Sequence, residues 1–303
     1  MTASITTHST IGGESWSNDW IELELADPDA ARSDYGRKLN ALAIIGFVAL
    51  GLVLLMAIVG PEVAPFDPNK PNPAMTLQGP SRDHLMGTDQ YGRDVFSRVL
   101  YAARLDVRIA ISITLLAMLV GSLVGGLIGF YGGVLEHVVM RIVDVILAFP
   151  GFVLALGIAA MLGNSTRNVV IAVAVAYIPY YVRLVRSEML ALREQEYASA
   201  AKVVGVRKIR ILLYHLMPNA IPIALAQATL TLGWGILDAA GLSFLGVGIR
   251  PPEAEWGVLV GEGAQYINSG EWWISVFPGL AILIAVLGFN LVGDWARDRF
   301  GPR

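Results

Sequence analysis

Few side chains in this sequence have the types and spacing that catalysis requires. The chain has no cysteine, which removes disulfides, thiolate metal ligands and cysteine nucleophiles. Its four histidines, at positions 8, 84, 137 and 215, lack the close spacing of a metal site. No phosphate-binding G-x-x-x-x-G-K-[ST] loop and no G-x-S-x-G or H-E-x-x-H motif is present. The sequence therefore predicts no catalytic residue, no metal site and no cofactor held by this chain.

The composition indicates that lipid solvates much of the chain. Hydrophobic residues make up 55% of the 303 residues. Charged residues make up only 16%, against about 25% in soluble domains. One soluble core has too little interior to hide so much apolar surface. The net charge of −3 provides no bulk attraction for nucleic acid, so no nucleic-acid partner is expected.

Six apolar segments approach the roughly 20 residues that a membrane-spanning helix needs. They are residues 41–60, 109–135, 145–166, 168–182, 211–237 and 272–293. The fourth is short, but it can extend past Arg183 because arginine side chains snorkel. The predicted fold is an all-α, polytopic membrane protein with six transmembrane helices, an extracytoplasmic segment at 61–108 and a five-helix core at 109–297. Pro150-Gly151 and Pro179 predict kinks in the third and fourth helices.

The distribution of lysine and arginine favours cytoplasmic termini. With the N-terminus inside, the inner segments hold 14 of the 22 basic residues, and the short outer loops hold only Arg167 and Arg250. Residues 1–40 are acidic and lack the apolar core of a signal peptide, so we expect a disordered cytoplasmic tail. Residues 298–303 form the cytoplasmic C-terminus. The expected location is the cell (inner) membrane, with several crossings and extensive lipid contact.

Glycines recur every four residues in the second span, at positions 121, 125, 129 and 133. Such a stripe lets another helix backbone approach closely. We expect ordinary helix packing, without a special partner, along this face.

The loop at residues 190–217 has the most informative pattern. Helical spacing predicts a short helix with one small apolar face, formed by Tyr197, Ala200, Ala201 and Val204. Gly205 is a natural C-cap. A second segment follows, with Ile209, Leu212, Leu213 and Leu216 expected on one side and with Arg207, Lys208 and Arg210 placed to meet headgroups. The short helix suits docking in a groove of another protein or lying on the membrane surface, and the residues alone leave both open.

This loop resembles the EAA loop of ABC-importer membrane subunits. The matching positions are Glu196, Ala200-Ala201, Gly205 and, after twelve residues, Pro218, whereas His215 and Met217 replace the usual isoleucine and leucine. Four further segments resemble the second, C-type permease of the dipeptide/oligopeptide/nickel transport group: HLMGTDQYGRDVFSR at 84–98, RIVDVILAFP at 141–150, GLSFLGVGIRPPEAEWG at 241–257 and FNLVGDWARDRFGPR at 289–303. Gly301 replaces the usual aspartate in the last segment.

The resemblance implies a type I ABC-importer permease architecture and a set of partners. These are a sister permease subunit, two cytoplasmic ABC ATPase domains that hold ATP and Mg²⁺, and an extracytoplasmic solute-binding protein. The implied ATPase-coupling residues are Glu196, Tyr197, Ala200, Ala201, Gly205, Arg207 and Pro218. The implied cargo is di- or oligopeptides, with nickel chelates, glutathione, opines or oligosaccharides as alternatives. A self-sufficient secondary transporter is the alternative from another class, although the halves show no clear repeat.

The remaining polar residues have two interpretations each. A cluster precedes the second span, at Asp89, Arg93, Asp94, Arg98, Arg104 and Asp106. Asp94 and Arg98 have i, i+4 spacing, which predicts a solvated amphipathic helix or, given the resemblance, a contact for the binding protein. Acidic residues at 253, 255, 262 and 271 predict an acidic outer surface.

Two acids lie at the edges of predicted spans. Asp144, three residues after Arg141, predicts a structural ion pair. Asp238 follows 27 uncharged residues, and an acid at membrane depth is a functional hypothesis by default. Asp238 could line the translocation path and meet a substrate amine or metal, or it could cap a helix or pair with the sister subunit.

Overall fold

The computed structural model describes the backbone of residues 28–300 and the side chains of residues 41–297 apart from residue 202. The chain divides into two units, Met1–Leu42 and Ala43–Arg303, and the architecture below is that of the second. Helix α2 (Pro28–Val63) begins inside the expected disordered tail, so residues 28–40 are helical. Residues 1–27 of that tail and residues 301–303 lie outside the described residues.

The described residues form helices and no strand, as the sequence predicts. After α2 the helices are α3 (Val95–Tyr131), α4 (Gly133–Leu147), α5 (Gly151–Leu162), α6 (Thr166–Arg193), α7 (Glu196–Val203), α8 (Lys208–Ile211), α9 (Met217–Phe244), α10 (Trp256–Ala264) and α11 (Trp273–Phe300). A π-helical turn, Leu212–Leu216, joins α8 to α9, and 3₁₀ turns occupy Pro73–Met75 and Ile267–Ser269. Five helices have the length and hydropathy to cross a membrane, and the pair α4 and α5 supplies a sixth if it counts as one broken span.

The third span differs most from the prediction of a helix over 145–166. The second span ends at Tyr131 because Gly132 and Gly133 adopt positive φ angles of 67° and 71°. Helix α4 then starts at Gly133, so that Arg141 lies inside a helix and not in a cytoplasmic turn. Pro150 ends this helix as predicted, and α5 continues at an angle of 92° to α4. Helix α6 runs without interruption through Pro179.

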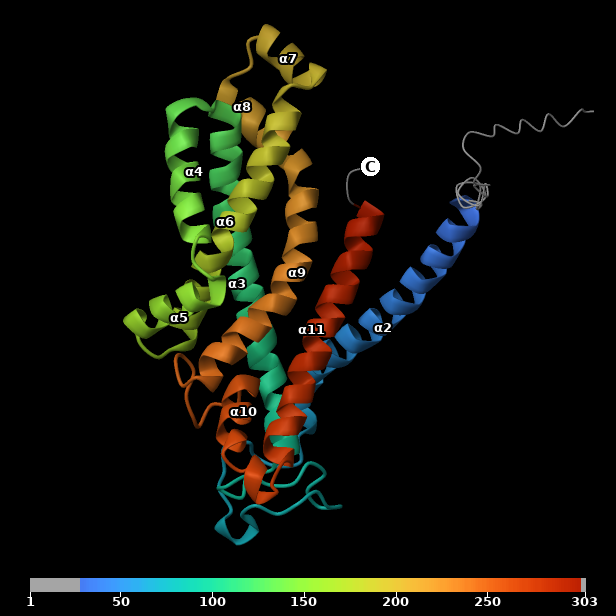
Figure 1. Ribbon diagram of the computed structural model, residues 1–303, viewed down its shortest axis with the longest axis vertical. Helices are drawn as coiled ribbons and strands as arrows, with labels where there is room; N and C mark the ends of the chain where they lie inside the picture. The colour runs from blue at the N-terminus through green and yellow to red at the C-terminus, as the bar shows by residue number, and fades with distance from the viewer. Residues whose placement is uncertain (1–27, 301–303) are drawn as a thin grey trace, which may run out of the picture. The chain divides into compact units, whose positions relative to one another are not determined.

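Helices α3, α6 and α9 form the centre of the bundle, and α11 packs against α9 (Figure 1). Three glycines of the predicted stripe bring α3 close to α6. A Cβ on Gly121 or Gly125 would lie 2.5 Å from the Tyr181 Cβ or the Val182 carbonyl oxygen, respectively. Gly133 is excluded from this face because α3 has ended. The stripe therefore packs within the chain, as expected, and Tyr181 adds a hydrogen bond of 2.9 Å to Thr231 of α9.

Gly125→Ala is expected to destabilise the bundle by about 1–3 kcal/mol, because the added methyl group meets backbone that cannot move aside. The measurement is the thermal melting of the purified protein in detergent. Gly157→Ala is the matched control, since a Cβ at this helical position meets nothing within 4 Å. Equal melting temperatures for Gly125→Ala and the wild type would contradict the close approach of α3 and α6.

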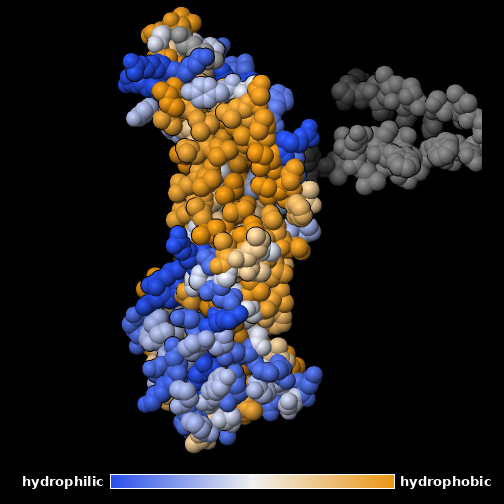
Figure 2. Space-filling view, turned by 90° about the vertical axis from the view of Figure 1, so that its left-hand side faces the viewer, coloured by the Kyte–Doolittle hydropathy of each residue, from blue (hydrophilic) through white to orange (hydrophobic). Residues whose placement is uncertain are grey.

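On the face shown in Figure 2, exposed apolar side chains form a belt across the middle of the bundle, with hydrophilic residues gathered towards both ends. Members of this belt include Leu119, Leu123, Val153 and Leu283, each about half exposed. One end carries the loop with α7, and the other carries α10 and the segment between α2 and α3 (Figure 1). This distribution is that of a protein whose middle is solvated by lipid.

Candidate functional site

The base of the α7 loop is held by arginines on the last turns of α6. Arg193 Nη1 donates a hydrogen bond of 3.0 Å to the carbonyl of Gly129 on α3. Arg186 Nε donates to Glu136 of α4 at 2.7 Å, and Arg183 pairs with Asp144 at 2.9 Å. The ion pair predicted for Asp144 is thus present, but its partner is Arg183 of α6. These contacts fasten the end of α6 to α3 and α4.

The α7 helix ends in the turn that the sequence predicts. Gly205 has a φ of +84°, a left-handed conformation that glycine adopts without a steric penalty. The Val206 N–H donates to the Ala201 carbonyl at 3.1 Å, which closes the C-terminal turn in the manner of a Schellman motif. The chain then reverses into α8, so α7 and α8 form a helical hairpin supported by α6 and α9.

The face that α7 presents matches the predicted one at three of its four positions. Ala198 is fully buried and Ala201 packs against the core, whereas Tyr197, Ala200 and Val204 are exposed. Val203 and Val204 at the tip are 88% and 82% exposed. Two adjacent, almost fully exposed valines therefore form an apolar tip on α7, at a hydrophilic end of the molecule.

The second segment of the loop also corrects the prediction. Leu212 and Leu216 are buried as expected, but Ile209 and Leu213 are each 45% exposed, and the unpredicted Ile211 is buried instead. The π turn at Leu212–Leu216 inserts an extra residue into the helical repeat and so changes which side chains face inward. Helical spacing alone does not reveal such a turn.

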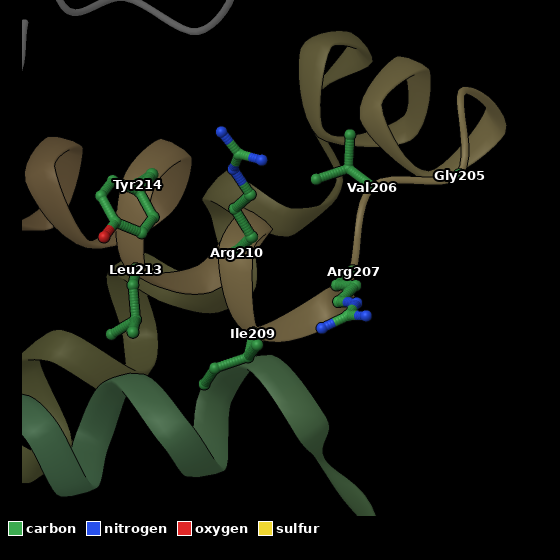
Figure 3. A pocket seen from close by; sticks show the side chains of 7 residues that line it. All are labelled: Gly205, Val206, Arg207, Ile209, Arg210, Leu213 and Tyr214. Atoms are coloured by element: carbon green, nitrogen blue, oxygen red, sulfur yellow. The ribbon is translucent and has the colours of Figure 1, made fainter.

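A hollow of about 660 Å³ opens beside the hairpin. Its lining consists of Gly205, Val206, Arg207, Ile209, Arg210, Leu213 and Tyr214 (Figure 3). Arg207 and Arg210 extend in different directions from the α8 ribbon, and neither forms an ion pair with a described side chain. Two free guanidinium groups, an aromatic ring and apolar side chains make a surface suited to an acidic or aromatic side chain of a partner.

The structure places all seven predicted coupling residues on or beside this hairpin. Glu196 starts α7, where its charge complements the helix dipole, and Pro218 lies in the first turn of α9. Tyr197 Oη accepts a hydrogen bond of 3.3 Å from Asn219, which ties α7 to α9. The sequence interpretation missed Val203 and Tyr214, which are also exposed on or beside the hairpin. Their exposure depends on the fold, so their position next to the recognised motif is the only signal in the sequence.

At the opposite end of the molecule, Asp94 does not pair with Arg98 as its spacing predicts. One oxygen of Asp94 accepts from the Ser97 N–H and hydroxyl, both at 2.7 Å, and so caps α3. The other lies 2.8 Å from His84 Nδ1. N-capping gives the backbone N–H of Ser97 a hydrogen-bond acceptor. That N–H would have no such partner if Asp94 formed an exposed pair with Arg98 instead.

The expected solvated helix around Arg98 is instead a buried ionic network. Arg98 is fully buried and donates to Glu262 of α10 at 2.9 Å. Arg93 donates to Asp89 at 2.6 Å and to Glu262 at 3.1 Å. The partner Glu262 lies 164 residues from Arg98, so local spacing could not reveal it. This network joins the outer segment to α10 and gives Asp94 and Arg98 structural contacts.

A buried pair of acidic residues at the same end corrects the predicted acidic outer surface. Glu255 is fully buried and caps α10 through hydrogen bonds from the N–H groups of Gly257 and Val258, at 3.0 and 2.8 Å. Asp106 accepts from the Trp256 N–H at 3.1 Å and also hydrogen-bonds to Glu255. Burial raises the pKa of Glu255 above its ordinary value. Glu255 therefore stays protonated to a higher pH than an exposed glutamate does.

Asp106→Asn is expected to flatten the pH dependence of stability. Because the pKa of Glu255 is raised in the folded protein, its protonation stabilises the fold fully at pH values below the ordinary pKa of 4.5. This contribution to the free energy of unfolding is lost as the pH rises through the raised pKa. The amide introduced by this substitution would keep the acceptor for the Trp256 N–H and would donate permanently to Glu255. Melting temperatures in detergent from about pH 5 to about pH 8 should fall less in this variant than in the wild type.

Glu253→Gln, which removes an exposed acid of the same loop, is the control and should keep the wild-type slope. A wild-type slope in Asp106→Asn as well would contradict a contribution of the Asp106–Glu255 pair to the pH dependence.

Asp238 of α9 is partly buried and receives a hydrogen bond of 2.8 Å from Tyr177 Oη of α6. It is neither a helix cap nor, among the described side chains, a member of an ion pair. Tyr177 carries no signal in the sequence that links it to Asp238, because the contact depends on the packing of α6 against α9.

Two family models match the chain. The model described as "Binding-protein-dependent transport system inner membrane component" covers residues 117–303, and that described as "N-terminal TM domain of oligopeptide transport permease C" covers residues 38–80. The chain is 41% identical to the dipeptide transport system permease protein of Alkalihalophilus pseudofirmus over 266 residues, which are 88% of this chain and 87% of that protein. It is 40% identical over 266 residues to the probable D,D-dipeptide transport system permease protein of Escherichia coli, with 88% of this chain and 89% of the relative covered.

Proposed function

Because the chain belongs to the family of binding-protein-dependent transport system inner membrane components, we propose that it is one permease subunit of an ATP-driven importer of di- or oligopeptides. The names of the relatives, which specify dipeptide and D,D-dipeptide transport, support peptides as the cargo. The chain is a multi-pass protein of the inner membrane. In this proposal it forms half of the translocation pathway.

The observation that carries the proposal is the α7–α8 hairpin, with its exposed valines and its basic hollow. The hairpin docks on a cytoplasmic ATPase domain, and closure of two such domains on ATP moves it. Because α7 is fastened to α6, and through Tyr197 to α9, the movement is passed to helices that run through the bundle. The spans then alternate between inward-open and outward-open arrangements.

The proposal assigns the remaining parts of the complex to partners. A sister permease completes the pathway, two ABC ATPase domains hold ATP and Mg²⁺, and a solute-binding protein delivers peptide at the end that carries α10. This chain is non-catalytic, and both of its termini are cytoplasmic. The arrangement of lysine and arginine along the sequence supports that orientation.

The experiment that tests the proposal is purification of the tagged chain from its own membranes in mild detergent. A sister permease and one or two P-loop ATPases should copurify and be identified by mass spectrometry. In liposomes the complex should take up peptide only with ATP and the binding protein. A chain that purifies alone and transports without ATP would refute the importer and indicate a secondary transporter.

Val203→Ser combined with Val204→Ser is expected to reduce the amount of ATPase that copurifies, because the apolar tip of α7 would lose its buried contact with the partner. The measurement is the ratio of ATPase to tagged chain after purification. Val134→Ser is the matched control, since this valine of α4 is 80% exposed outside the hairpin. An unchanged ratio in the double variant would contradict docking through this tip.

A further inference from the structure

Asp238 and Tyr177 lie within the membrane-spanning length of the bundle. Asp238 is six residues before the end of α9, which places it about 9 Å along the helix from Phe244. Tyr177 is eleven residues into α6. Both residues are thus on the half of the bundle nearer α10, the end at which cargo would enter.

The charge of Asp238 has no counterion among the described side chains. Two acids of α4, by contrast, have one: Asp144 pairs with Arg183, and Glu136 pairs with Arg186. Asp238 has only the Tyr177 hydroxyl, which binds one oxygen and leaves the other without a hydrogen bond from the described chain. A carboxylate at this depth is costly in lipid, so its ionised form is stabilised only by water or by a cation from outside the chain.

Two further aromatic side chains lie within one helical turn of the Asp238–Tyr177 pair along their own helices. Trp234 lies one helical turn before Asp238 on the same face of α9 and is 48% exposed. On α6, Tyr180 is 47% exposed, and its ring centroid is 6.0 Å from that of Tyr177. Aromatic faces attract ammonium groups, and the attraction grows as water is excluded. A carboxylate beside exposed aromatic rings is therefore chemistry that selects a cation over an anion or a neutral group.

We propose that Asp238, oriented by Tyr177, and the exposed rings of Trp234 and Tyr180 form a transit site for the α-ammonium group of a peptide crossing the membrane. This inference rests on the proposed function and names the part of the cargo that the site recognises. Every peptide with a free N-terminus carries this group, whatever its side chains. A single fixed carboxylate can therefore bind the α-ammonium group of peptides of many sequences, without specificity for any one of them.

The test uses the complete importer in proteoliposomes with saturating, loaded binding protein and a labelled dipeptide whose side chains are uncharged. Asp238→Asn should lower ATP-dependent uptake about tenfold, a factor equivalent to the loss of one charge-assisted hydrogen bond. Stimulation of the ATPase by the binding protein should persist. Asp238→Glu should keep most of the uptake, and Asp294→Asn, which removes an exposed acid of α11, is the control. Trp234→Leu should lower uptake, and Trp234→Phe should not.

Each contrary result has a definite meaning. Wild-type uptake in Asp238→Asn would overturn the site, and so would an equal loss in Asp238→Glu, because charge would then be irrelevant. Loss of the sister permease from purified Asp238→Asn would overturn it in favour of an ion pair between subunits. Absence of ATP-dependent uptake in the wild type would instead refute the proposed function, and the site with it.

Discussion

Gly205→Val should lower ATP-dependent uptake at least about tenfold while the protein stays assembled in the membrane. A left-handed conformation costs an ordinary residue about 1–2 kcal/mol, and a β-branched side chain is tolerated least. No atom lies within 4 Å of the position that a Cβ would occupy at Gly205, so strain in the turn, and not a clash, is the cause. The turn can relax by moving α7 away from the position in which it docks. Uptake and ATPase activity of the reconstituted complex measure the effect.

The chain offers a close control for this variant. Gly163 has a φ of +85°, against +84° for Gly205, and it also has no atom within 4 Å. It lies just before the other end of α6, so Gly163→Val introduces the same strain away from the hairpin. That variant should transport, and so should Gly205→Asn, because asparagine tolerates the left-handed region. Normal transport by Gly205→Val would remove the coupling role of this turn.

Arg98→Met should destabilise the protein by about 3–5 kcal/mol, the cost of leaving a buried charge without its partner. Asp89 and Glu262 would then share Arg93 alone, inside a region closed to water. Because the network joins the outer segment to α10, we expect a lower melting temperature in detergent and less protein in the membrane. A binding-protein contact at this position would instead leave stability unchanged and reduce only the response to binding protein.

Two comparisons isolate the buried charge as the cause. Arg104 pairs with Glu62, whose side chain is 62% exposed, and donates to the carbonyls of Ala57 and Ile58, so Arg104→Met should cost less than Arg98→Met. Combining Arg98→Met with Glu262→Met removes one charge of each sign, and the double variant should recover part of the lost stability. A double variant that loses the sum of the single effects would show that Arg98 acts through packing and not through charge.

The two ends of the molecule are built for different tasks. At the α10 end, charges are buried and paired, which suits a rigid surface that receives a partner without changing shape. At the α7 end, apolar and basic side chains are exposed on a hairpin supported by two long helices. Under the proposed function, the binding protein would meet the rigid α10 end and the ATPase would act on the projecting hairpin at the α7 end.

The sequence by itself determined the features that depend on local chemistry. Apolar length predicts membrane helices because lipid offers no hydrogen bonds to the backbone, and the glycine stripe of α3 predicts close packing because glycine lacks a side chain. Gly205 after a short helix predicts a left-handed turn, and Pro150 predicts the break before α5. Each of these signals acts on the backbone or the solvation of its own segment and does not depend on which polar partner the fold brings to it.

Only the tertiary structure decided which polar groups meet. The spacing of Asp94 and Arg98 predicts a pair, but burial made other partners better: Ser97 and His84 for the aspartate, and Glu262 for the arginine. Glu255 looks like a surface acid in the sequence and is buried beside Asp106. The bond between Tyr177 and Asp238 likewise joins two helices. A charge removed from water takes whichever partner the packing brings to it, and packing joins residues that are far apart in the chain.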